Sequence, residues 1–199
     1  MRLLLDTDAF VKLGCGGIVG DLAAALGTDL AGCRRLPALP YMLRRGRLAA
    51  RLGCARCRDL LALVGQVRAA PAPDPLWLDR MSSIPSLDPG EVHLLAVAAC
   101  APKGVLLACG DKRAMAALPR VCGLCRALAG RLVTLEMATI MVCEAIGLDQ
   151  LLTRMTNALD LDTTLAVCLR SGDALAGLRS YHRDLVASSQ PSVFYVSHP

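Results

Sequence analysis

Continuous apolar runs that end at an acidic residue or a turn are the most regular pattern along this chain. The first run, at 2–6, ends in Asp6, and the second, at 105–109, is followed by Gly110 and Asp111. A third candidate lies at 131–135. Because these runs are short, apolar and bounded by turn residues, they predict buried strands.

Apolar and amphipathic stretches between the runs predict helices. One opens at 88–91, where Pro89 needs no N–H partner and Glu91 complements the helix dipole, and it runs to about residue 99. The other predicted helices cover 9–13, 18–26, 41–67, 77–81, 112–118, 137–146, 159–170 and 173–187. Short strands that alternate with helices indicate an α/β protein with a mainly parallel sheet.

The last part of the chain follows this pattern less clearly. Residues 1–155 carry the alternating strands and helices, whereas 156–199 hold two helical stretches and a final run at 192–196. That final run is typical of an edge strand or of a loose tail. We expect 156–199 to form a helical extension that dimerises the chain, docks a partner or extends the core.

Composition narrows the class of protein. Hydrophobic residues make up 54% of the chain, so we expect a sizeable core and exclude disorder of the whole chain. Aromatic residues make up only 3%, which argues against binding nucleic acid by stacking bases. There is no secretory leader pattern and no apolar run of about 18 residues, so we expect a cytoplasmic protein without a membrane partner.

Three acidic residues are expected to meet at one edge of the sheet. Asp6 and Asp111 follow different strands, and Glu91 opens the helix before the second of them. In an open parallel sheet, sites form at the carboxyl ends of the strands. Carboxylates without His or Cys suit hard cations such as Mg²⁺ or Mn²⁺, which activate water for phosphodiester hydrolysis. The alternative is that each acid only caps a local helix.

Taken in order, these segments resemble the PIN-domain nucleases. The opening Leu-Leu-Leu-Asp6-Thr-Asp8 looks like the first strand of that family, and 87–91, before an Ala/Leu helix, is similar to its central acidic helix. The segment 105–114 looks like the strand that carries a late catalytic Asp, and 131–135 resembles the strand that follows. The resemblance covers residues 1–150, roughly the predicted α/β part.

The resemblance implies a three-layer α/β/α fold and metal-dependent cleavage of RNA. It implies that Asp6, Glu91 and Asp111 are the catalytic metal ligands, and it makes Asp8 and Asp88 secondary candidates. Many family members are toxins of toxin–antitoxin pairs. RNA, an antitoxin or another protein, and a second copy of the chain are therefore the partners to consider.

The chain also departs from the family in its acidic residues. The family usually places another acid after a Pro-containing connector, but this chain has Arg44 and Arg45 there and no acid from 34 to 58. Cys109 and Gly110 stand where many members carry paired acids or a hydroxyl. Two functions stay open: a metal-dependent endoribonuclease, and an inactive PIN-like module that binds RNA or a protein partner.

Eight arginines lie between residues 34 and 58. At helical spacing, four of them fall near one face: Arg44, Arg47, Arg51 and Arg58. Arginine binds phosphate through paired hydrogen bonds. The predicted RNA contacts are Arg44, Arg45, Arg47 and Arg113. The alternatives are a solvated face in an Arg-rich protein, and entry of Arg44 or Arg45 into the acidic site in place of a metal ion.

Two C-x-x-C pairs, Cys54/Cys57 and Cys122/Cys125, suggest a structural zinc site. The pairs lie far apart, and the first is inside a helical stretch, so packing as small apolar residues is the favoured interpretation. A zinc-stabilised assembly protein remains the alternative. The three histidines, His93, His182 and His198, are scattered and predict no catalytic triad.

Overall fold

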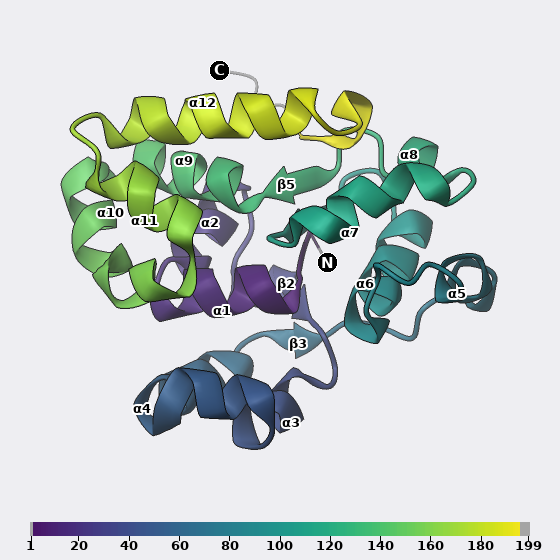
Figure 1. Cartoon of the computed structure of the whole chain (residues 1–199). Coiled ribbons are helices and arrows are strands. Elements are labelled where there is room, and N and C mark those ends of the chain that lie inside the picture. The colour runs from purple at the N-terminus through teal and green to yellow at the C-terminus, as the bar shows by residue number, and fades with distance from the viewer. Residues whose placement is uncertain (1, 196–199) are drawn as a thin grey trace.

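Five parallel strands form the centre of the protein in a computed structural model that describes residues 2–195 (Figure 1). Their order in the sheet is β3-β2-β1-β4-β5. The strands are β1 (Leu3–Leu5), β2 (Cys33–Arg35), β3 (Arg68–Ala69), β4 (Leu106–Cys109) and β5 (Leu132–Thr134). The predicted α/β architecture with a parallel sheet is therefore confirmed, and it is compatible with three layers.

The apolar runs correctly predict β1, β4 and β5 but not the two strands at the other side of the sheet. Strand β2 pairs with β1 in the register Leu3 with Cys33 and Leu4 with Arg34. Strand β3 has only two residues, and both are exposed. Neither β2 nor β3 forms an apolar run, because the arginines they contain lie at a partly exposed side of the sheet.

Twelve α-helices connect and cover the strands within residues 2–195. They are α1 (Thr7–Cys15), α2 (Val19–Ala25), α3 (Leu39–Arg44), α4 (Arg47–Val64), α5 (Pro75–Ser82), α6 (Pro89–Cys100), α7 (Lys112–Ala117), α8 (Leu124–Ala127), α9 (Leu135–Ile146), α10 (Leu148–Met155), α11 (Thr163–Arg170) and α12 (Ala174–Ala187). Helices α1 and α9 pack against β4, and α2 packs against α9. Helix α6 packs against β4 and α8.

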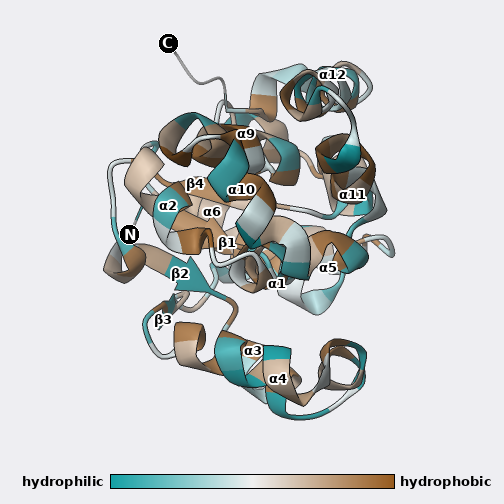
Figure 2. Cartoon of the chain, turned by 90° about the vertical axis from the view of Figure 1, so that its left-hand side faces the viewer, coloured by the Kyte–Doolittle hydropathy of each residue, from teal (hydrophilic) through white to brown (hydrophobic). Residues whose placement is uncertain are grey.

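The helix predicted at 41–67 is two helices, and this part of the prediction is wrong. Helix α3 ends at Arg44, and Gly46 then has a φ of 92° before α4 begins. Gly53 interrupts α4 with a φ of 79° and a ψ of 166°. Helices α3 and α4 form a hairpin that projects below the sheet in Figure 1, and both carry hydrophilic and hydrophobic residues (Figure 2).

Residues after α10 pack onto the rest of the protein. A 3₁₀ helix, η3 (Thr156–Leu161), contacts α1, while α12 packs along α9. Leu165, Leu178 and Val193 are fully buried in the same hydrophobic core as β1. These contacts support extension of the core among the three alternatives for the C-terminal segment.

The run predicted at 192–196 forms no regular strand within the described residues. Pro191–Val193 form a 3₁₀ helix, η4, and Phe194 makes a parallel bridge to Leu132 of β5. Val196, at the end of that prediction, and His198 lie outside the described residues.

The connection between α6 and β5 is held by a buried arginine. Arg131 is 4% exposed and donates to the carbonyls of Val105, Ala101 and Ala127 at 2.8, 3.2 and 3.1 Å. Its Nη2 has no hydrogen-bond partner among the described residues. Burial lowers the pKa of this guanidinium, so Arg131 joins three segments at an electrostatic cost.

Across residues 2–195, no helix has both the length and the apolar character needed to cross a membrane.

Candidate acidic site at the sheet edge

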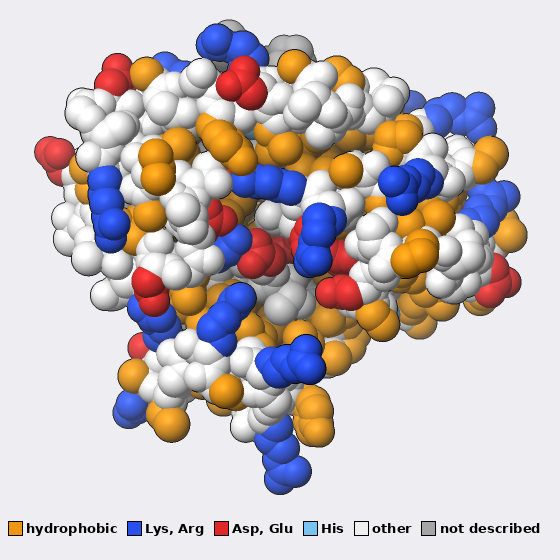
Figure 3. Space-filling view, in the orientation of Figure 1, with side chains coloured by type: hydrophobic (Ala, Val, Ile, Leu, Met, Phe, Trp, Pro, Cys, Tyr) orange, Lys and Arg blue, Asp and Glu red, His pale blue; other side chains and the backbone are white. Residues whose placement is uncertain are grey.

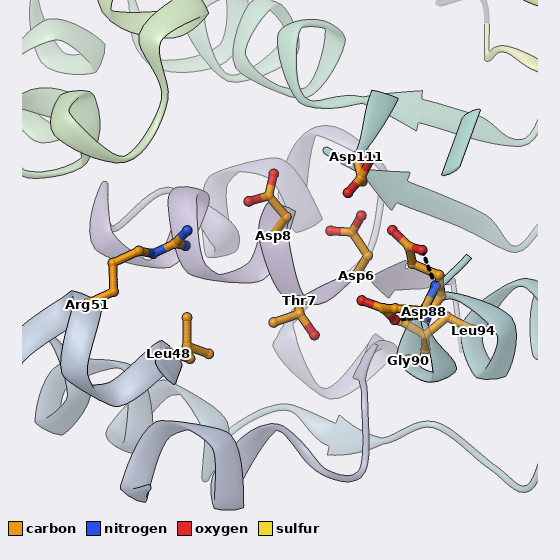
Figure 4. A pocket seen from close by; sticks show the side chains of 10 residues that line it. Asp6, Thr7, Asp8, Leu48, Arg51, Asp88, Gly90, Leu94 and Asp111 are labelled. Carbon is orange, nitrogen blue, oxygen red and sulfur yellow. Dashed lines mark hydrogen bonds between the residues drawn. The ribbon is translucent and has the colours of Figure 1, made fainter. Parts of the chain in front are cut away.

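A cavity of about 140 Å³ opens where β1 and β4 end. Five acidic residues line it: Asp6, Asp8, Asp88, Glu91 and Asp111. In the close view, the carboxylates of Asp6, Asp8 and Asp111 lie around the same space (Figure 4). Acidic side chains also gather in a hollow at the centre of the space-filling view, with Lys and Arg side chains around it (Figure 3).

Asp6 connects the ends of the two central strands. It follows β1, and its Oδ1 accepts a hydrogen bond from the Ala9 N–H at 2.5 Å, which caps α1. Its Oδ2 accepts from the Gly110 N–H, just after β4, at 2.9 Å. Asp6 is 5% exposed, and this burial, together with the charge of Asp8, raises its pKa to about 6.

Glu91 faces the cavity from the first turn of α6. Asp88 and Glu91 form a capping box: Asp88 accepts from the Glu91 N–H at 2.8 Å, and Glu91 accepts from the Asp88 N–H at 2.7 Å. Partial burial raises the pKa of Glu91 to about 7, and the charges of Asp88, Asp111 and Asp6 add to this rise. The carboxylates are therefore close enough to repel one another.

Asp111 differs from Asp6 and Glu91 because nearby donors offset its negative charge. It caps α7 by accepting from the N–H groups of Arg113 and Ala114 at 2.7 and 3.3 Å. The exposed Arg113 side chain also pairs with it at 3.0 Å. Burial alone would raise the pKa of Asp111, but the hydrogen bonds from Arg113 and Ala114 outweigh burial and lower it.

Asp8 lines the cavity but is also bound to a buried lysine. The ammonium of Lys12 lies 2.5 Å from Asp8 and 2.7 Å from Asp162, which follows η3. Gly110 also packs against Asp8, where a Cβ atom would overlap the Asp8 carboxylate. These contacts place Asp8 at the cavity as one member of an ion-pair network.

The two interpretations of the acidic residues therefore both describe part of the site. Asp6, Glu91 and Asp111 line one cavity, and each also caps the start of a helix. Their all-oxygen donor set suits Mg²⁺ or Mn²⁺. However, no three His, Cys, Asp or Glu side chains within residues 2–195 are arranged to hold a metal ion. The Asp88 N–H occupies Oε2 of Glu91, and Oε1 accepts no hydrogen bond among the described residues.

Arg51 is the arginine of the α3–α4 hairpin that lines the cavity. It reaches toward the acids from α4 in Figure 4 and forms no ion pair among the described residues. Arg44 instead lines a separate hollow between α3 and α4. Neither Arg44 nor Arg45 lines the acidic cavity, so the prediction that one of them enters it is not supported.

The predicted single face of arginines is wrong. Arg45 has an extended backbone, and Gly46 and Gly53 break the helical register between Arg44 and Arg58. Arg44, Arg45 and Arg47 are exposed on the hairpin, and Arg113 is exposed beside the cavity. Their role as RNA contacts stays a prediction.

Sequence reasoning gave no role to Lys12. The spacing of Lys12 from Asp8, one helical turn, and its place in an otherwise apolar helix are signals that could have identified the pair. Arg51 was expected only as a member of the arginine face. Its position at the cavity could not be predicted, because it depends on where Gly46 and Gly53 turn the chain.

The cysteines and histidines form no additional site among the described residues. Cys54 and Cys57 lie on α4 and Cys122 and Cys125 lie at α8, which is on the other side of the molecule in Figure 1. All ten cysteines are free thiols. His93 contacts the Pro71 carbonyl at 3.1 Å. His182 contacts the Thr134 hydroxyl at 3.0 Å, and burial lowers its pKa.

Comparison of the chain with models of protein families, with curated proteins and with solved structures finds no significant match in any of the three.

Proposed function

We propose that the acidic cavity binds Mg²⁺ or Mn²⁺ and that the protein is a PIN-like endoribonuclease. The observation that carries this proposal is the excess negative charge of the cavity. Among the described residues, no Lys, Arg or His lies within 4.0 Å of the carboxylates of Asp6, Asp88 or Glu91. A cation in the cavity would stabilise its ionised acids, because it would offset the repulsion between their negative charges.

Asp6, Glu91 and Asp111 are the residues that would hold the ion. Asp6 is buried and anchored to both central strands, so it would contribute a fixed oxygen. Glu91 is half-buried and would offer its Oε1 to the cation, because its Oε2 accepts from the Asp88 N–H. A bound divalent ion supplies a water of lowered pKa and stabilises charge on a phosphodiester.

Arg51 gives the cavity one basic wall opposite the acids. Its guanidinium is exposed and free of ion pairs among the described residues, so its N–H groups are available to a phosphate oxygen. A cavity of about 140 Å³ with acids on one side and an arginine on the other suits a phosphodiester bound next to a cation.

A labelled single-stranded RNA incubated with the purified protein tests this function. Cleavage should require Mg²⁺ or Mn²⁺ and stop with EDTA. Asp6→Asn and Asp111→Asn should each lower the rate by about 100-fold or more, because each removes a charged ligand. Asn can still cap a helix, so Asp74→Asn, at the cap of α5 and outside the cavity, is the matched control. Cleavage by both site variants at the wild-type rate would exclude this assignment.

A PIN-like module that binds RNA without cleaving it is the second candidate. It is favoured by the capping geometry of the acids and by Arg51 in a region where the family usually places an acid. This function predicts salt-sensitive RNA binding that needs no divalent ion and causes no cleavage. Arg51→Ala should weaken that binding, whereas Arg170→Ala, on α11 and outside the cavity, should not.

A further inference from the structure

Residues 160–164, from the end of η3 to the start of α11, contact three elements that carry residues of the acidic cavity. Asp160 accepts two hydrogen bonds from Arg56 of α4, both at 2.8 Å. Asp162 accepts from Lys12 of α1 at 2.7 Å. Thr164 accepts from Lys112 of α7 at 3.1 Å.

Two of these contacts involve a residue bonded or adjacent to an acid of the cavity, and the third reaches α4 beyond the break at Gly53. Helix α4 also carries Arg51, and Lys112 directly follows Asp111. The second partner of Lys12 is Asp8 itself. A segment more than 40 residues beyond the last acid of the cavity thus reaches α1, α4 and α7.

The contact between Asp162 and Lys12 is the most deeply buried of the three. The Lys12 side chain is 9% exposed and that of Asp162 is 12% exposed. A buried ammonium needs opposite charge around it, and Lys12 has two carboxylates. Without the charge of Asp162, the positive charge of Lys12 would be balanced by Asp8 alone, beside the cavity.

We infer that residues 160–164 are a positioning segment that holds α1, α4 and α7 around the acidic cavity and sets its affinity for a divalent cation. Within this segment, Asp162 has the largest effect on cation affinity. Its carboxylate balances part of the positive charge of Lys12 beside the cavity, and Lys12 in turn holds Asp8 in position. The effect on cation affinity rests on the proposed function, whereas the effect on the position of α4 does not.

Two matched substitutions separate this role from simple stabilisation. Asp162 and Asp173 cap α11 and α12 in the same way, each accepting from a backbone N–H at 2.9 Å. Asn keeps such a cap, so Asp162→Asn and Asp173→Asn differ in the loss of the Lys12 partner and in burial, because the side chain of Asp162 is 12% exposed and Asp173 is exposed. Thermal unfolding of both variants is measured first, and the titrations are then performed where both are folded.

Titration with Mn²⁺ by calorimetry is the main measurement. Asp162→Asn should weaken Mn²⁺ binding by about three- to tenfold, because Lys12 then takes up the charge of Asp8 alone and less negative charge is left beside the cavity, while Asp173→Asn should stay within about twofold. Equal effects of the two variants, or no effect of Asp162→Asn, would overturn the role of Asp162.

A metal-free measurement covers the cases in which the wild type binds no Mn²⁺ or Asp162→Asn does not fold. Asp160→Asn removes the ion pair with Arg56, which lies at the surface and is not part of the core. Amide hydrogen exchange at 54–60, in the part of α4 that follows Gly53 and carries Arg56, should then become up to about threefold faster than in the wild type, as expected for a surface ion pair. Unchanged exchange there would overturn the positioning role, whereas absent Mn²⁺ binding with faster exchange would exclude only the proposed metal site.

Discussion

The sheet edge and the α3–α4 hairpin form opposite walls of the acidic cavity, but different forces hold them. At the sheet edge, Leu3–Leu5 are fully buried between β2 and β4, and Asp6 bonds to backbone from two elements. The hairpin relies on a few buried side chains, including Leu43 and Leu60, on a surface ion pair to Asp160, and on two glycines with positive φ.

This difference separates what a hydrophobic pattern determines from what it does not. A buried strand fixes where its last residue lies, because a shift of one residue would expose its apolar side chains. The direction of α4 depends on the backbone at Gly46 and Gly53, where φ and ψ fall in a region that only glycine readily adopts. The sheet therefore holds the acids rigidly, whereas the position of Arg51 changes with the backbone angles at Gly46 and Gly53.

Truncation of a buried leucine in each wall should give the largest effect. Leu4→Ala, in the central strand, should lower the free energy of unfolding by about 3–5 kcal/mol, since it leaves a cavity in the core against one face of the sheet. Leu43→Ala should cost about 2–3 kcal/mol and should mainly open the hairpin. Urea denaturation gives the first quantity, and hydrogen exchange in α3 and α4 gives the second. If Leu43→Ala speeds exchange equally in β1, the two walls unfold as one unit.

Replacing a glycine by alanine in α4 and in α2 should change the free energy of unfolding by an intermediate amount, with opposite signs. Gly53 has a φ of 79°, so Gly53→Ala should destabilise the protein by about 1–2 kcal/mol although no atom lies within 4 Å of the added Cβ. Gly20, inside α2, also has open space around it, and Gly20→Ala should stabilise the protein by about 0.5–1 kcal/mol. Both values come from urea denaturation. A stabilised Gly53→Ala variant would mean that α4 can straighten without cost.

The pH dependence of stability tests the sheet edge alone. The pKa of Glu91 rises from 4.5 to about 7 on folding, so the folded protein holds a proton that the unfolded chain has lost between these values. Stability from this group is complete below the unfolded pKa and is lost as the pH rises toward 7. The wild type should therefore lose stability relative to Glu91→Gln over this range, as measured by thermal unfolding from pH 4 to pH 8, roughly the limits set by these values.

Addition of Mn²⁺ should sharpen this last prediction. If the cavity binds the ion, Mn²⁺ favours the ionised form of Glu91 and should restore the stability of the wild type at the upper end of the range. Glu91→Gln should respond less. Parallel stability curves of the two proteins without metal would mean that folding does not raise the pKa of Glu91.

The sequence carried enough information to predict the strands at the acidic edge and the acids themselves. The runs before Asp6 and Asp111 are apolar because both strands lie in the core, and Pro89 with Glu91 signals the start of a helix. Strand β2 was not predictable in this way, because its arginines, which bond to the backbone carbonyls of Ala31 and Val64, interrupt the apolar pattern. The pairing of Lys12 with Asp162 joins residues 150 positions apart, and no local pattern reports such a contact.

The central position of β1 also determines when the acidic cavity can exist during synthesis. Strand β1 pairs only with β2 and β4, and Asp6 bonds to Gly110 after β4. At translation rates of about 5–20 residues per second, Asp6 leaves the ribosome several seconds before its neighbours at the sheet edge. Asp162, the second carboxylate that pairs with Lys12, is synthesised later still. Until late in its synthesis, the nascent chain therefore exposes Lys12, which is buried in the folded protein, and the unpaired edges of its strands. The acidic cavity is consequently among the last features of the protein to form.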